Sequence, residues 1–194
     1  MASMAVSTEE HTSWPVVPPG GEWTVDLLEQ LPDDNLKYEL LDGVLLVSPA
    51  PTPRHQRAIL RLAIVLTGAC PDDHEVFISP LDWQPDQRTS LEPDLLVVAK
   101  DRIGAKNIQQ NPTIVIEVLC PSSRRYDRLL KSSRYADAGV PQYWIVDPDK
   151  PSVEVYHLDD TGGYTLTGAA EGDGTLTVTG PLPVTLTPSA LVNR

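Results

Sequence analysis

The sequence of 194 residues contains no long apolar run, and cysteine, phenylalanine and positive charge are all scarce. Its most apolar helical stretch, AILRLAIVL, is interrupted by Arg61, whereas a membrane-spanning helix needs about 18 apolar residues. The first residues, MASMAVSTEEHTSWP, are polar and acidic, unlike the basic and then apolar start of a secretion signal. We therefore expect no membrane segment and a cytoplasmic location.

The two cysteines, Cys70 and Cys120, do not have the paired spacing of a metal site. Cytoplasmic proteins keep their thiols reduced, so we expect both cysteines to be free. With 41% apolar residues, the chain can build an ordinary hydrophobic core. We expect a flexible tail over residues 1–21, which are polar and rich in Pro and Gly, and a single domain over residues 22–194.

The chain has 27 acidic residues and only 15 Lys and Arg residues, which gives a net charge of −12. Such a charge disfavours non-specific nucleic-acid binding, which depends on neutralising phosphates. However, residues 1–50 contain nine acidic residues and one Lys, whereas residues 111–149 contain five charges of each sign. The basic residues of the second segment are Arg124, Arg125, Arg128, Lys131 and Arg134. Net charge alone therefore does not identify the partner.

Patterns in the first half of the chain predict two helices, a hairpin and two strands. TVDLLEQLPDD predicts a short helix, and KYELLDGVLLVS predicts a hairpin that turns at Asp42-Gly43. An apolar stripe at helical spacing predicts a long helix over residues 52–70, with Thr52 as its N-cap. The strands expected in this half are EVFISP and EPDLLVVAK.

The second half predicts a strand–helix–strand unit followed by short antiparallel strands. TIVIEVL is typical of a strand covered on both faces, and a helix capped by Ser122 or Ser123 follows it as far as Gly139. The next strand is PQYWIVDP, so the connection predicts a parallel pair with a right-handed crossover. VEVYHLD, GGYTLTG and GTLTVTG predict an antiparallel extension. The fold class is therefore α/β, with a mixed sheet flanked by helices.

Three acidic residues stand where strands should be apolar. Asp94 precedes LLVV, Glu117 interrupts TIVIEVL, and Glu39 interrupts KYELL. A buried carboxylate without a partner is costly, so each needs a cation, a hydrogen-bond donor or a metal. Mg²⁺ fits this requirement, because it prefers oxygen ligands and often takes one or two protein carboxylates together with substrate phosphate.

The helix after Glu117 brings positive charge to the same end of the sheet. Lys131 and Asp127 are four residues apart, so they share a helix face. The turn CPSS places the helix N-terminus directly after the strand, and helix N-termini attract phosphate oxygens. Carboxylates, a Lys and several Arg gathered there would suit metal-assisted attack of water on a phosphodiester.

Four segments with a shared order and spacing carry a resemblance to a known family. They cover residues 37–158 and are YELLDGVLLVSPAPTPRHQ, EPDLLVV, IEVLCPSSRRYDRLLKSSRYADAGVPQYWIVDP and VEVYHL. The chain resembles the Uma-type restriction-endonuclease-like family, long catalogued as a domain of unknown function, in the PD-(D/E)XK nuclease superfamily. The resemblance implies a restriction-endonuclease-like mixed β-sheet flanked by helices, with a C-terminal antiparallel extension. It also implies a Mg²⁺-dependent endonuclease that acts on nucleic acid, with DNA as the expected substrate and Mn²⁺ as a substitute cofactor.

The resemblance assigns roles to the acidic residues. Asp94 and Glu117 would be catalytic and would bind the metal, with Glu39 as an assisting catalytic acid. The motif asks for Lys two residues after the second acid, but Leu119 stands there. The resemblance implies that the catalytic Lys has moved to the following helix, as Lys131, where it would orient the attacking water or stabilise charge on the phosphate.

Other residues would contact nucleic acid or support the site. The expected nucleic-acid contacts are Arg124, Arg125, Arg128 and His55, and the expected supporting residues are Asp127 and Tyr135. His55 would otherwise be a core or capping histidine or would orient a carboxylate, and the arginines would otherwise form a solvated helix face.

Each acid also has a structural alternative. Glu117 would form a salt bridge with an Arg or Lys, because structural ion pairs also perturb buried acids. Asp94 would end a turn after Pro93. Glu39 would form a cross-strand ion pair within the hairpin.

Other functions also stay open. A catalytically inactive binding or regulatory module with the nuclease fold is consistent with the charge of −12 and with Leu119. A sugar hydrolase would need two acids flanking a neutral groove, and the Arg/Lys cluster argues against it. An Arg/Lys-rich partner protein would suit the acidic segments. A homodimer is expected only by analogy with nucleases that cut both strands.

Overall fold

The computed structural model describes residues 21–121 and 124–193, so residues 1–20 of the expected tail lie outside the described residues. The helices are α1 (Val25–Leu28), α2 (Pro53–Ala69), α3 (Ser132–Ala138) and α4 (Pro188–Val192), with a 3₁₀ turn η1 (Lys100–Arg102) and a π-helical segment η2 (Tyr126–Lys131). The strands are β1 (Lys37–Leu41), β2 (Val44–Ser48), β3 (His74–Ile78), β4 (Trp83–Asp86), β5 (Thr89–Leu91), β6 (Leu95–Ala99), β7 (Ile114–Val118), β8 (Gln142–Asp147), β9 (Ser152–Leu158), β10 (Tyr164–Glu171), β11 (Leu176–Val178) and β12 (Val184–Leu186).

The centre of the molecule is a six-stranded mixed sheet with the order β10-β9-β8-β7-β6-β3. The β7–β8 pair is parallel, with Glu117 opposite Ile145, whereas the other pairs of this sheet are antiparallel. The predicted parallel pair and the predicted α/β class with a mixed sheet are therefore confirmed. The strands β9 and β10 form the predicted antiparallel extension at one edge.

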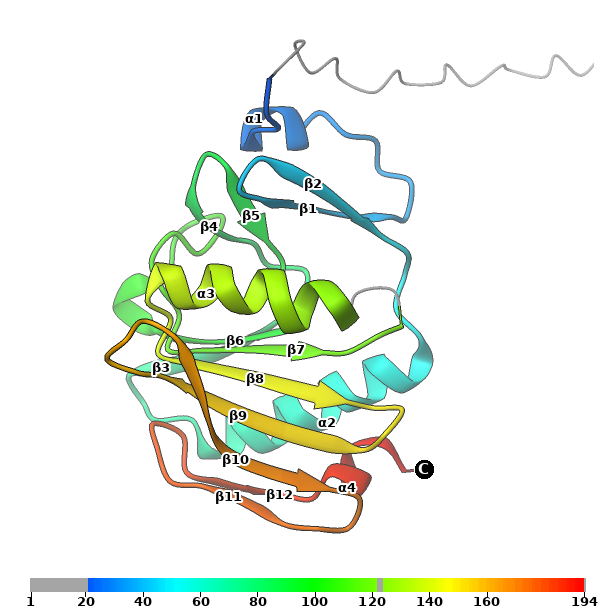
Figure 1. The fold of residues 1–194 in the computed structure, drawn as a ribbon, viewed down its shortest axis with the longest axis vertical. Coiled ribbons are helices and arrows are strands. Elements are labelled where there is room, and N and C mark those ends of the chain that lie inside the picture. Colours follow the sequence, from blue (N-terminus) through cyan, green and yellow to red (C-terminus); the bar gives the residue numbers. More distant parts are fainter. Residues whose placement is uncertain (1–20, 122–123, 194) are drawn as a thin grey trace, which may run out of the picture.

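Helices cover both faces of this sheet, with α3 on one side and α2 on the other (Figure 1). Successive strand residues point to opposite faces, so the strands supply two cores. Leu95 packs with Leu62 of α2, whereas Leu96 and Val115 pack with Tyr135 of α3. The strand that carries Glu117 is therefore covered on both sides, as its continuous apolar sequence predicted.

A second sheet with the order β2-β1-β5-β4 lies beside the first. Its β1–β2 hairpin turns at Asp42 and Gly43, whose φ angles of 49° and 83° are those that an Asp-Gly turn provides. The strands β4 and β5 were not predicted, because both are short and β4 contains Pro85. This sheet positions β1 so that Glu39 faces the chain segment between β5 and β6.

The helices match their sequence signals in part. The side chain of Thr52 accepts a hydrogen bond from the His55 N–H, as expected for the N-cap of α2. The helix after β7 ends at Gly139, with φ of 82°, while its expected caps Ser122 and Ser123 lie outside the described residues. The first helix is shorter than predicted, with only four residues. Within residues 21–121 and 124–193, no helix is long and apolar enough to cross a membrane.

The C-terminal segment departs from a simple continuation of the sheet. GTLTVTG supplies β11, which pairs with β12 in a separate two-stranded sheet. Apolar residues of this small sheet and of α4 pack into the core beneath α2. The C-terminal segment therefore adds to the core on the α2 side of the central sheet.

Candidate active site

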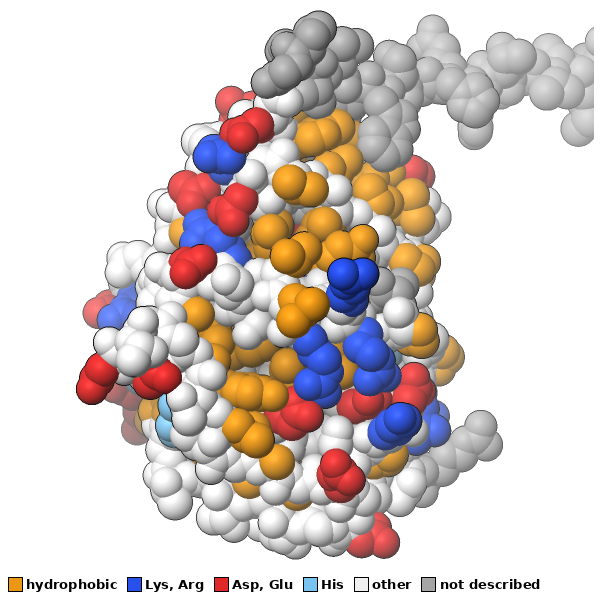
Figure 2. Space-filling view, viewed as in Figure 1, with side chains coloured by type: hydrophobic (Ala, Val, Ile, Leu, Met, Phe, Trp, Pro, Cys, Tyr) orange, Lys and Arg blue, Asp and Glu red, His pale blue; other side chains and the backbone are white. Residues whose placement is uncertain are grey.

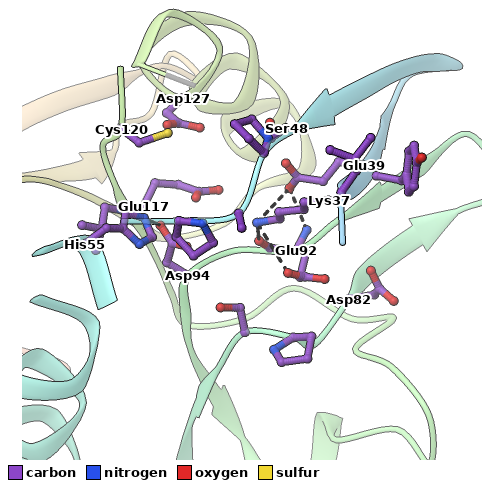
Figure 3. Close-up of a pocket in the computed structure, with 18 of the residues that line it drawn as sticks. Lys37, Glu39, Ser48, His55, Asp82, Glu92, Asp94, Glu117, Cys120 and Asp127 are labelled. Carbon is purple, nitrogen blue, oxygen red and sulfur yellow. Dashed lines mark hydrogen bonds and ion pairs between the residues drawn. The ribbon is translucent and has the colours of Figure 1, made fainter. Parts of the chain in front are cut away.

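Acidic side chains from both larger sheets line a pocket of about 660 Å³. Its buried charged residues are Glu39, Asp94, Glu117, Asp127, Lys131 and His55. Figure 3 shows His55, Asp94 and Glu117 on one side of the pocket, with Lys37, Glu39 and Glu92 on the other. The structure therefore brings together the residues that the sequence singled out from five separate segments.

Asp94 and Glu117 are neighbours because of the strand register. Leu95 of β6 lies opposite Ile116 of β7, so Asp94, one residue before, lies beside Glu117, one residue after. The Oδ2 of Asp94 also accepts a hydrogen bond of 2.7 Å from the N–H of Val118. Both carboxylates are thus fixed at adjacent strand ends.

His55 contacts Asp94 from the first turn of α2. Its Nε2 lies 3.1 Å from the Oδ2 of Asp94, and both side chains are buried. Although burial alone would raise the pKa of Asp94, the hydrogen bond from His55 and nearby positive charge lower it. The structure therefore places His55 where it orients a carboxylate, which is one of the roles considered from the sequence.

Glu117 is held through a single oxygen. Its Oε1 accepts hydrogen bonds from the Lys131 ammonium group at 3.1 Å and from the Tyr135 hydroxyl at 3.0 Å. Burial raises the pKa of Glu117 to about 8, against the opposing charge of Lys131, and the carboxylates of Asp127 and Asp94 add to the rise. Tyr135, which was expected to support the site, therefore contacts Glu117 directly.

Lys131 lies at the centre of three carboxylates. Its Nζ is 2.9 Å from Glu39, 3.1 Å from Glu117 and 3.5 Å from Asp127. Although burial disfavours its charge, these carboxylates raise the pKa of Lys131 well above its usual value. Leu119, at the usual position of the motif Lys, is instead packed in the core.

The π-helical segment η2 carries both Asp127 and Lys131. Its turn is wider than that of an α-helix, a distortion found frequently at functional sites. The backbone carbonyl of Asp127 accepts a hydrogen bond of 2.9 Å from the Tyr143 hydroxyl of β8. The sheet therefore supports the segment from which Lys131 enters the pocket.

Glu39 enters from the hairpin sheet and joins it to the centre. Its Oε1 accepts hydrogen bonds of 2.9 Å from Lys131 and from the N–H of Glu92. Although burial alone would raise its pKa, the positive charges of Lys131 and Lys37 lower it. The cross-strand neighbour of Glu39 is Leu46, so the alternative of a cross-strand ion pair within the hairpin is wrong.

The three acids of the predicted site share one pattern. In each, the donors converge on one oxygen: Oε1 of Glu39, Oε1 of Glu117 and Oδ2 of Asp94. Within the described part of the chain, no hydrogen bond reaches their other oxygens, and these are not buried without a partner. Each carboxylate therefore has one anchored oxygen and one oxygen available to a ligand.

The donor set fits a hard divalent cation. The pocket has four buried acidic side chains, three of them around its buried Lys, so acidic groups outnumber this buried cation. Among the described residues, no three His, Cys, Asp or Glu side chains form a ready-made metal cluster. Two adjacent carboxylates nevertheless match the way Mg²⁺ binds, with one or two protein carboxylates and the rest water or phosphate.

The predicted nucleic-acid contacts of the helix are engaged by acidic partners. Arg124 forms a bidentate ion pair with Asp147. Arg128 forms a bidentate ion pair with Glu154, with distances of 2.8 and 3.2 Å. Arg125 is exposed. Figure 2 shows basic side chains beside acidic ones on the face that carries α3, without a continuous basic surface. Contact of these arginines with nucleic acid stays a prediction.

The sequence reasoning missed Lys37 as a pocket residue. The Nζ of Lys37 lies 3.7 Å from Glu39 and 3.6 Å from Glu92, and it donates a hydrogen bond to the Glu92 carbonyl. The signal was present, because Lys37 stands two residues before Glu39 and strand residues two apart share a face. Glu92 stands two residues before Asp94, a spacing that indicates a supporting or a solvated acid, and it lies on the pocket wall.

A mixed sheet flanked by helices, with two acids side by side on adjacent strands, defines a protein of the restriction-endonuclease-like class. The sequence comparison agrees with this class over most of the chain. The chain belongs to the Uma2 family, described as "Putative restriction endonuclease", whose model matches residues 25–191. The family resemblance predicted from the sequence is therefore confirmed.

Two individual proteins illustrate the similarity. The chain is 28% identical over 135 residues to "Uncharacterized protein slr1290" of Synechocystis sp. (strain ATCC 27184 / PCC 6803 / Kazusa), a match that covers 67% of this chain and 70% of that protein. It superposes with a TM-score of 0.70 on a protein of Anabaena variabilis ATCC 29413, described as "a putative nuclease belonging to DUF820". That match covers 87% of this chain and 97% of the other at 21% identity, so it confirms the fold.

Proposed function

We propose that the protein is a Mg²⁺-dependent endonuclease that hydrolyses phosphodiester bonds in nucleic acid, with DNA as its substrate. The observation that carries the proposal is the pairing of Asp94 with Glu117, each held through one oxygen with the other available. Membership of the restriction-endonuclease family supports a nuclease reaction. The requirement for Mg²⁺ and the choice of DNA as substrate belong to this proposal, and the cleavage assay below tests both.

Asp94 and Glu117 are the residues that would hold Mg²⁺, and Mn²⁺ would fit the same oxygen donors. When bound, the cation supplies a water of lowered pKa and neutralises charge on the phosphate. The chain contributes preorganisation. His55 and the Val118 N–H fix Asp94, whereas Lys131 and Tyr135 fix Glu117. Carboxylates held in this way need not reorganise during the reaction, and this lowers the activation free energy.

Glu39 and Asp127 act through Lys131. Both acids contact the Lys131 ammonium group, so they fix its position beside Glu117. A buried Lys with three acidic neighbours stays protonated, and its charge keeps Glu117 close to ionisation despite burial. Lys131 and its acidic partners thereby keep Asp94 and Glu117 facing the pocket, although among the described residues these two carboxylates do not each have a Lys or Arg of their own.

The test is cleavage of plasmid, single-stranded DNA and RNA in Mg²⁺ and Mn²⁺, with Asp94→Asn and Glu117→Gln beside the parent. Both substitutions preserve shape and remove one charge, so we expect activity to fall by about two orders of magnitude or more. Glu75→Gln is the matched control, because Glu75 is exposed on β3 and does not line the pocket. Cleavage that persists in both pocket variants would contradict the proposal.

A second function is favoured by one specific observation. Arg124 and Arg128 are paired with acids, and Lys131 is enclosed by three carboxylates, so much of the local positive charge is already neutralised. A catalytically inactive binding or regulatory module would tolerate this arrangement. Calorimetric titration with Mn²⁺ separates the two functions, since the nuclease requires a cation at Asp94 and Glu117 and the inactive module does not.

A further inference from the structure

We propose that Lys37, and not Lys131, provides the ammonium group that binds a phosphate oxygen of the substrate. The proposal rests on the proposed nuclease function and assigns its phosphate contact to Lys37 of β1, a residue that the PD-(D/E)XK motif does not include. It divides two tasks between the two lysines of the pocket. Lys131 holds the carboxylates of Glu39, Glu117 and Asp127 in place, and Lys37 binds the substrate phosphate.

Lys131 is committed to its acidic partners, since two of its N–H donors reach Glu39 and Glu117 and Asp127 is an ion-pair partner. An ammonium group has three N–H donors, and three carboxylates surround that of Lys131 at 2.9, 3.1 and 3.5 Å. Its side chain is only 3% exposed, so a ligand in the pocket has little access to it. Contact with a phosphate would require Lys131 to leave an acidic partner buried and without its cation, which is costly.

Lys37 has the opposite properties. Its side chain is 25% exposed in the same pocket, and one N–H is donated to the backbone carbonyl of Glu92. The carboxylates of Glu39 and Glu92 lie 3.7 and 3.6 Å away, beyond the 2.7–3.2 Å typical of a hydrogen bond. Among the described residues, two donors of Lys37 therefore have no acceptor within this range, and Figure 3 shows this group across the pocket from Asp94.

The charge of the pocket makes such a cation necessary. Acidic residues on its wall, among them Asp82 and Glu92, would repel a phosphodiester. Lys106, the remaining Lys on the wall, is 76% exposed and forms an ion pair of 2.6 Å with Glu29. Of the pocket lysines, Lys37 alone combines access, a fixed position and unused donors.

Lys37 could serve the fold instead, by neutralising Glu39 and Glu92. A purely structural Lys would affect stability, whereas a phosphate contact also contributes to the salt dependence of binding. Each neutralised phosphate contributes about −0.9 to the slope of log affinity against log salt for duplex DNA. The salt slope therefore separates the two roles.

The experiment measures binding of a short fluorescent DNA duplex at a series of salt concentrations, with Ca²⁺ in place of Mg²⁺ so that the DNA stays intact. The full-length parent is compared with Lys37→Gln, Lys37→Arg and Lys100→Gln. Lys100 is the matched control, because it is exposed on η1 at the far end of the strand that follows Asp94. Cleavage in Mg²⁺ is measured on the same proteins.

We expect Lys37→Gln to bind about tenfold more weakly, since it loses a charged hydrogen bond, and to reduce the magnitude of the slope by about 0.9. Lys37→Arg should restore the slope, and Lys100→Gln should leave it unchanged. An unchanged slope in Lys37→Gln, with a parent that binds and cleaves, overturns the role of Lys37 but not the nuclease. A parent that neither binds nor cleaves DNA overturns both.

Discussion

The Nε2 of His55 lies 3.1 Å from the Oδ2 of Asp94, and this contact joins the first turn of α2 to the start of β6. The position of His55 follows from local rules, because Thr52 caps the helix through the N–H of His55 itself. Cap, histidine and carboxylate therefore form one chain of contacts. The orientation of an expected metal ligand thus depends on where a helix begins.

The first prediction concerns this contact. His55→Ala leaves the Oδ2 of Asp94 with the Val118 N–H as its only hydrogen-bond donor among the described residues, so Asp94 loses part of its orientation. We expect Mn²⁺ affinity, measured by calorimetry, to fall about 10- to 100-fold, the range typical of residues that orient a metal ligand. His157→Ala, on β9 and outside the pocket wall, should bind Mn²⁺ like the parent. Equal affinity in His55→Ala and the parent would show that Val118 alone orients Asp94.

The second prediction concerns Lys131. Lys131→Met removes the cation shared by Glu39, Glu117 and Asp127 and leaves buried carboxylates facing one another. Breaking a buried ion pair in this way costs about 3–5 kcal/mol, so we expect a loss of that size in the free energy of unfolding in urea. Lys100→Met should change it little. A Lys131→Met variant as stable as the parent would contradict the structural role of Lys131.

Local sequence signals predicted much of this fold because each rests on nearby residues. The Asp42-Gly43 turn, the strand around Glu117 and the helix end at Gly139 need only backbone preferences and an apolar pattern. The pairing of Asp94 with Glu117 required the family motif in addition, because no local rule states which strands are neighbours. The motif and the strand register agree on this pair.

The remaining features depend on partners far apart in the sequence. Asp147 and Glu154, which pair with Arg124 and Arg128, come from the end of β8 and from β9, so the arginines looked like free positive charge in the sequence. The enclosure of Lys131 likewise needs Glu39, which is 92 residues away. Sequence reasoning identified these charged residues, but it did not identify the ion-pair partner of each one.

The third prediction concerns Glu117 and pH in the absence of metal. Burial raises the pKa of Glu117 from 4.5 to about 8, so the folded state binds its proton more tightly than the unfolded state does. The parent therefore loses stability from this group as the pH rises from about 5 to about 8. Glu117→Gln has no such proton, so its free energy of unfolding should rise relative to that of the parent across this window. Urea denaturation in EDTA measures the difference, and a constant difference would contradict the raised pKa.

The fourth prediction concerns the ion pair between Arg124 and Asp147, which lies outside the acidic pocket. Although burial alone would raise the pKa of Asp147, hydrogen bonds from Arg124 and from the N–H groups of Lys150 and Asp149 lower it below 3.8. Asp147 therefore stabilises the fold above about pH 4, and this contribution is lost as the pH falls through its lowered pKa.

We expect Asp147→Asn to lower the free energy of unfolding at neutral pH by about 1–2 kcal/mol, a modest value because the Arg124 side chain is 36% exposed. Asp149→Asn, on the exposed turn that follows, is the matched control. The difference between Asp147→Asn and the parent should shrink as the pH falls from about 4 through the lowered pKa of Asp147, below which Asp147 is protonated in both states. Denaturation at several pH values tests this, and a difference independent of pH would mean that Asp147 stabilises the turn by its shape and not by its charge.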